Sequence, residues 1–165
     1  MNTDGENREV FRFSDHRQER IHRRLLLIGP GPAAFYRDAC ALMQGQPPLT
    51  TTTHLVAHLV REIESAMRDV LEVLYQPPQI VPLAQTSPSN HQQEILAILH
   101  GLGIEESDPV AQAWLKLAGA DNPYNLATRA HRDSLAAPRP LDDTFIDFWH
   151  RFESVLHMVL VVLDI

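Results

Sequence analysis

The sequence predicts an all-α protein, a single helical domain over residues 1–165 built as a bundle of about six helices. In the two longest periodic segments, about 52–75 and 143–164, apolar residues recur every three or four positions, the spacing of an amphipathic helix. No segment shows the sustained two-residue alternation, bounded by turn residues, that is typical of a strand. We expect the two long helices to run antiparallel.

The first half of the chain begins with two predicted helices. The first covers residues 15–28, with Ser14 as its N-cap, and belongs to a basic N-terminal segment, residues 8–24, that carries a net charge of +3. Gly29-Pro30-Gly31-Pro32 then ends this helix, because proline cannot continue one. Pro32 suits the first turn of the second helix, which runs to about Met43.

The third helix is the clearest in the sequence. It opens at the threonines Thr50 to Thr53, whose hydroxyls can accept the free N–H groups of the first turn. Pro77-Pro78 ends it, and the loop-forming residues that follow predict a flexible loop over 76–90. Its expected core stripe consists of Leu55, Leu59, Ile63, Ala66, Val70 and Leu74.

The second half predicts three helices over about 90–101, 109–118 and 123–132, followed by the last long one. Asp108 precedes a proline and Asp142 precedes the last periodic segment, so both are expected to cap helices. The expected core stripe of the last helix consists of Phe145, Trp149 or Phe148, Phe152, Leu156, Val159 and Leu163.

Composition excludes several classes of protein. Hydrophobic residues make up 44% of the chain and charged residues 21%, which is typical of a globular domain. The net charge of −7 disfavours a general nucleic-acid binder, and the single cysteine, Cys40, excludes a disulfide framework. No apolar run reaches the ~20 residues of a membrane span, and acidic residues at the start do not fit a signal peptide. We therefore expect a cytoplasmic protein.

Motifs for catalysis or metal binding are weak. His54, His58 and Glu62 share one helix face, but the first and last lie ~12 Å apart along a straight helix, too far for one ion. There is no Gly-x-Ser-x-Gly, and Cys40 between two alanines is expected to be a buried structural thiol. We predict no metal site, no cofactor and no assigned catalytic residue.

The most distinctive polar segment precedes the last helix and concentrates three arginines and a histidine. Arginine can bind a phosphate or carboxylate through two parallel hydrogen bonds, and histidine can exchange protons near neutral pH. The alternative is an internal arginine–carboxylate network with Asp133, Asp142 and Asp143 as partners. The candidate anion- or ligand-binding residues are Arg129, His131, Arg132 and Arg139.

The arrangement of several helices, two of them long, resembles the HEPN-like helical bundles of bacterial conflict and toxin systems. The stretch from Thr53 to Glu64, followed late in the chain by Ala130-His131-Arg132, also resembles N-terminal helical regions of larger bacterial proteins. HEPN ribonucleases carry an arginine followed about four to six residues later by a histidine. Arg17 with His22, and Arg151 with His157, have this spacing.

Two functions follow as expectations. The first is a non-catalytic helical interaction or assembly module, the N-terminal region of a larger bacterial cytoplasmic protein, which binds a protein partner or itself through its apolar C-terminal helix. The second, implied by the resemblance, is a HEPN-type RNA nuclease or a catalytically inactive relative. A nuclease needs an arginine and a histidine converging in one cleft, whereas an interaction module needs an exposed apolar patch. No membrane contact is expected.

Overall fold

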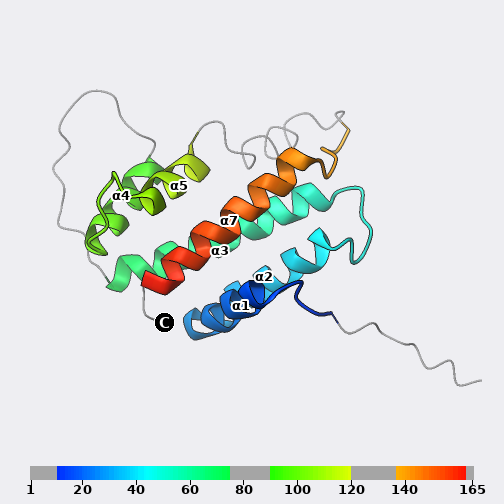
Figure 1. Cartoon of the computed structure of the whole chain (residues 1–165), viewed down its shortest axis with the longest axis horizontal. Helices are drawn as coiled ribbons and strands as arrows, with labels where there is room; N and C mark the ends of the chain where they lie inside the picture. Colours follow the sequence, from blue (N-terminus) through cyan, green and yellow to red (C-terminus); the bar gives the residue numbers. More distant parts are fainter. Residues whose placement is uncertain (1–10, 75–89, 120–136, 163–165) are drawn as a thin grey trace, which may run out of the picture.

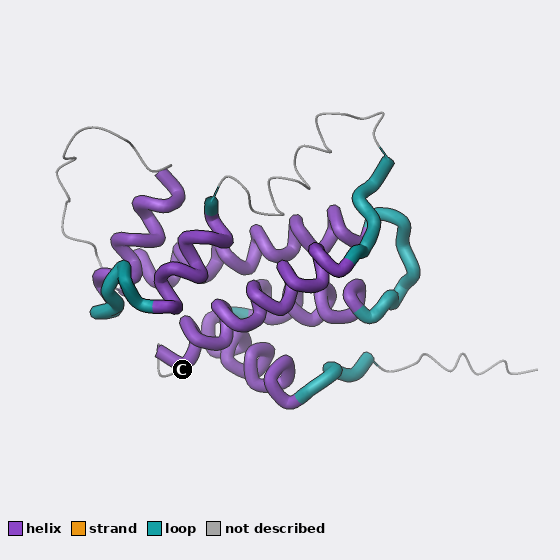
Figure 2. Tube along the Cα trace, turned by 45° about the horizontal axis from the view of Figure 1, so that its top comes forward, coloured by secondary structure: helices purple, strands orange, loops and turns teal. Residues whose placement is uncertain are grey.

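A computed structural model describes residues 11–74, 90–119 and 137–162, and within them the chain forms six helices and no strand (Figure 1, Figure 2). The all-α bundle predicted from the sequence is confirmed. No helix in these ranges is both long enough and apolar enough to cross a membrane. The helices are α1 (His16–Ile28), α2 (Pro30–Met43), α3 (Thr52–Leu74), α4 (Asn90–Gly101), α5 (Pro109–Ala118) and α7 (Asp143–Val162).

The helices pack in the order of the chain and close on themselves. Each described helix contacts the next, from α1 through to α5, and α5 in turn contacts α7. Helix α7 then packs against α1, so the first and last helices are neighbours. Helices α4 and α5 lie side by side near the end of the bundle where α3 and α7 terminate (Figure 1).

The expectation that the two long helices run antiparallel is wrong. Helices α3 and α7 run in the same direction (Figure 1), and the Thr53 hydroxyl at the start of α3 donates to the Arg139 carbonyl just before α7 at 2.7 Å. Antiparallel order is usual for helices joined by a short loop. Here α4 and α5 stand between them in the sequence, so no short connection fixes their direction.

Short-range capping defines the helix ends, largely as predicted. Asp108 accepts the Val110 N–H at 2.8 Å, and Asp142 accepts the Phe145 N–H at 2.9 Å. At α1 the predicted cap is wrong by one residue, because Asp15 rather than Ser14 accepts the Gln18 N–H, at 2.8 Å. A carboxylate is a stronger acceptor than a hydroxyl for these free N–H groups.

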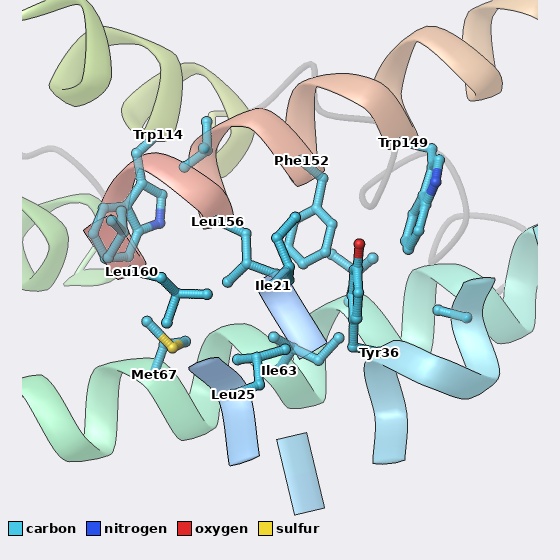
Figure 3. Close-up of a cluster of buried hydrophobic side chains, with 14 of the residues drawn as sticks. Ile21, Leu25, Tyr36, Ile63, Met67, Trp114, Trp149, Phe152, Leu156 and Leu160 are labelled. Carbon is cyan, nitrogen blue, oxygen red and sulfur yellow. The ribbon is translucent and has the colours of Figure 1, made fainter. Parts of the chain in front are cut away.

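One hydrophobic core runs through all six helices (Figure 3). Its largest fully enclosed side chains come from elements distant in sequence, among them Tyr36 on α2, Ile63 on α3 and Phe145 on α7. Aromatic rings cluster along α7, where Trp149 contacts Phe152 with ring centroids 5.8 Å apart. The predicted stripe of α7 is buried from Phe145 to Val159.

The buried stripe of α3 is shifted by one residue from the prediction. Leu55 is 39% exposed and Val70 is half-buried, while Ile63 is buried as expected. Both stripes have helical spacing, because the helix is apolar over a wide arc, and packing against α2 decided between them. The buried residues are Val56, Ala57, Val60, Ile63, Met67 and Leu71.

Two further expectations lie outside the described residues. They are the short helix over 123–132 and the flexible loop over 76–90, except that Asn90 begins α4.

We expect Phe152→Ala to lower the free energy of unfolding by about 3–5 kcal/mol, because it removes a large ring from the enclosed core. Leu55→Ala on the exposed side of α3 is the control, and it should change stability by less than about 1 kcal/mol. Chemical denaturation measures both. A similar small loss in the two variants would show that the core is not centred on α7.

Candidate functional site

Only one of the four candidate residues predicted from the sequence lies within the described residues. Arg139 is mostly buried, and its Nη2 lies 3.4 Å from Asp142 Oδ1. The Phe145 N–H, and then Arg139, lower the pKa of Asp142. Arg139 therefore pairs with an internal carboxylate, which was the expected alternative to binding an external anion. The other candidates lie outside the described residues: Arg129, His131 and Arg132.

The most elaborate polar cluster surrounds Glu153, which sequence reasoning did not single out. Its side chain lies on α7 and is 1% exposed. Oε1 accepts the amide of Gln18 on α1 at 2.7 Å and the hydroxyl of Tyr36 on α2 at 2.9 Å. Oε2 accepts Arg17 Nη2 on α1 at 2.9 Å and lies 3.7 Å from the His150 ring. The carboxylate thus joins three helices.

Helix capping and packing close to each donor position it beside Glu153. Arg17 and Gln18 lie in the first turn of α1, which the Asp15 cap fixes, and the Gln18 side chain also accepts the Ser14 N–H at 2.9 Å. Tyr36 is enclosed between α1 and α7, with its ring stacked on Trp149 at a centroid distance of 5.9 Å (Figure 3). A buried carboxylate is costly without such partners. The cluster satisfies it fully.

The other reactive groups beside Glu153 hold their protons. Burial, followed by the charges or dipoles of Cys40 and Glu153, raises the pKa of Tyr36. Burial also raises the pKa of the Cys40 thiol to about 12. A thiol acts as a nucleophile only as the thiolate, so Cys40 is inert near neutral pH. Its predicted burial is confirmed.

The two arginine–histidine pairs suggested by spacing point in different directions. Arg17 faces α7, whereas His22 packs on the Phe13 ring at a centroid distance of 5.0 Å. Arg151 is exposed, and His157 faces α1. Residues five or six apart on one helix are offset by roughly 120–140°, so neither pair converges within its own helix.

Between α1 and α7, however, arginines and a histidine do gather. Burial lowers the pKa of His157, and the charges of Arg20, Arg24 and Arg17 lower it further. His157 Nδ1 and Arg24 Nη1 are both buried, and neither has a hydrogen-bond partner among the residues that the structure describes. This cluster joins residues about 140 positions apart, so no local motif announces it.

A metal site receives no support from the described residues, in which no group of three His, Cys, Asp or Glu side chains is placed to hold an ion. On α3, His58 Nδ1 lies 4.0 Å from Glu62 Oε1, and both side chains are exposed.

Comparison with known proteins gives no match: no family model, no curated protein and no solved structure is significantly similar to this chain.

We expect Tyr36→Phe to lower the free energy of unfolding by about 1.5–3 kcal/mol, because it removes a hydroxyl donor from a buried carboxylate. In a Glu153→Gln background the same change should cost less, since the acceptor is neutral. Ser154→Ala is the control, because Ser154 lies beside the cluster at 3.5 Å from Arg17. Equal costs of Tyr36→Phe in both backgrounds, measured by denaturation, would contradict a charged acceptor.

We expect the free energy of unfolding to decrease as the pH is lowered below about 6.5, the ordinary pKa of histidine. Burial lowers the pKa of His22 and His157 in the folded state, so the unfolded state binds more protons as the pH drops. Denaturation between about pH 7.5 and about pH 5.5 should show this loss of stability in the wild type. The loss should be smaller in His157→Gln, and smaller still in the double variant that also carries His22→Gln. An unchanged slope in the double variant would refute the assignment.

Proposed function

We propose that the chain is a non-catalytic helical interaction module that self-associates through one end of its bundle. Helices α1, α3 and α7 all terminate at this end (Figure 1). We call its exposed side chains the terminal apolar patch, defined as Leu26, Leu27, Val73, Val161 and Val162.

The distribution of exposed apolar residues carries the proposal. Five of the eight large hydrophobic side chains exposed among the described residues belong to the terminal apolar patch. Leu27 is 70% exposed and Val73 is 77% exposed. Single exposed apolar residues are ordinary, but several on three helices that terminate at the same end of the bundle favour an interaction surface (Figure 1). Fully burying one such side chain is favourable by about 1.5–3 kcal/mol.

The polar groups of the bundle support a non-catalytic role. Glu153 is surrounded by donors, and the raised pKa values of Tyr36 and Cys40 leave both without nucleophilic character near neutral pH. The RNA-nuclease alternative came from a resemblance to helical bundles, and neither of the two arginine–histidine pairs with HEPN spacing, Arg17 with His22 and Arg151 with His157, converges within its helix.

The experiment is light scattering of the full chain over a range of concentrations. We expect the wild type to shift from monomer to dimer, and the double variant Leu27→Asp, Val161→Asp to remain monomeric, because burying the new carboxylates is unfavourable. The matched control is Leu55→Asp with Leu141→Asp, which places the same charges on exposed leucines away from the terminal apolar patch. The control should dimerise like the wild type.

Two results would overturn the proposal. One is a wild-type chain that stays monomeric at the highest concentration reached. The other is loss of the dimer in the Leu55, Leu141 control but not in the Leu27, Val161 variant, which would place the contact elsewhere.

A further inference from the structure

Helices α1 and α7 run in the same direction with a fixed register. The ion pair between Arg17 and Glu153 aligns residues 136 positions apart in the sequence. On this register His157 lies level with residue 21, between Arg20 and Arg24 on α1. Residues three and four apart share one face of a helix, so Arg17, Arg20 and Arg24 all lie along the side that meets α7. The lowered pKa of His157 agrees, since the three arginines contribute to it.

The charge of Arg17 is balanced by Glu153, but no described carboxylate balances the charges of Arg20 and Arg24. Among the described residues, neither the exposed Arg20 nor the half-buried Arg24 forms an ion pair, and Arg24 Nη1 is buried without any hydrogen-bond partner. His157 Nδ1 beside them is also buried and unpartnered. Buried polar groups in proteins are nearly always hydrogen-bonded, and an exception needs an explanation.

The nearby carboxylates are already engaged elsewhere. Glu153 accepts hydrogen bonds from three side chains, and Glu19 lies 3.2 Å from His16. Asp15 caps α1 by accepting the Gln18 N–H. None of them can move to Arg24 without breaking a hydrogen bond or contact that it already makes. Within the described part of the chain, Arg20 and Arg24 are therefore left without an anionic partner, in a protein whose net charge is −7.

We propose that the seam formed by Arg20, Arg24 and His157 binds a phosphate-bearing anion. Two guanidinium groups present two planar sets of donors, and each can bind phosphate oxygens bidentately. A phosphate monoester carries a charge of about −1.5 to −2 at neutral pH, which matches two unpaired arginines. A carboxylate carries a single charge and would satisfy only one. This inference is independent of self-association through the terminal apolar patch.

The test is an NMR titration of the full chain with inorganic phosphate, following the His157 ring at constant ionic strength set with chloride. We expect saturable shifts at millimolar phosphate. Arg20→Gln or Arg24→Gln should weaken binding about tenfold, because each removes a charge-assisted contact. Arg23→Gln is the matched control, since Arg23 is an exposed arginine of the same helix that, unlike Arg20 and Arg24, does not contribute to the lowered pKa of His157, and it should leave the affinity within about twofold.

Three further probes identify the source of the phosphate. Adenosine monophosphate supplies the same dianion on a small molecule, a short oligoribonucleotide supplies singly charged phosphodiesters in a backbone, and acetate supplies a carboxylate instead. Tighter binding of the monophosphate or of the oligoribonucleotide, lost in Arg24→Gln but kept in Arg23→Gln, supports the site and names its ligand. Binding of acetate in preference to phosphate overturns the proposal, as does oligoribonucleotide binding that Arg23→Gln weakens equally.

Thermal melts separate a binding role from a structural one. A ligand that binds only the folded state raises the melting temperature, so phosphate should stabilise the wild type but not Arg24→Gln. Without phosphate, Arg24→Gln should melt no lower than the wild type, since it removes an unpaired charge beside Arg20 and His157. A marked loss of stability in phosphate-free Arg24→Gln, or no response of the His157 ring to phosphate, would refute the proposal.

Discussion

The carboxylate of Glu153 links α7 to α1 and α2, and the closure of the helical ring depends on it. It accepts hydrogen bonds from Arg17 and Gln18 on the first helix and from Tyr36 on the second. Burying one charge among apolar side chains is unfavourable unless several donors converge on it. Only one relative placement of the three helices brings these donors together, so the cluster selects a single register among the many that a merely apolar contact would allow.

The same constraint determines which polar groups remain available. Tyr36 and Cys40 are enclosed with the carboxylate, and burial holds their protons in place. Arg17 is paired with Glu153, and this pair sets the register between α1 and α7. In that register Arg20 and Arg24 lie along the same seam, where no carboxylate among the described residues pairs with them. The ion pair that aligns α1 with α7 thus places a positively charged seam beside His157.

Parallel packing has a second consequence, at the ends of the helices. Because α1, α3 and α7 all run the same way, their last turns meet at one end of the bundle (Figure 1). Apolar side chains that an antiparallel arrangement would distribute over both ends are gathered there, including Leu27, Val73 and Val161. The direction of the helices therefore concentrates the exposed apolar surface on which self-association is proposed.

Local chemistry determined the parts of this protein that its sequence alone could reveal. Asp108 and Asp142 were predictable as caps because a cap needs only its own next few N–H groups, and the helical class followed from spacing. Tertiary contacts decided the rest. Leu55 and Val56 fit a helical stripe equally well until α2 packs against α3, and the direction of α7 depends on no local signal. Glu153 reads as one polar residue within an apolar helix, because its partners Arg17 and Tyr36 lie more than a hundred residues away.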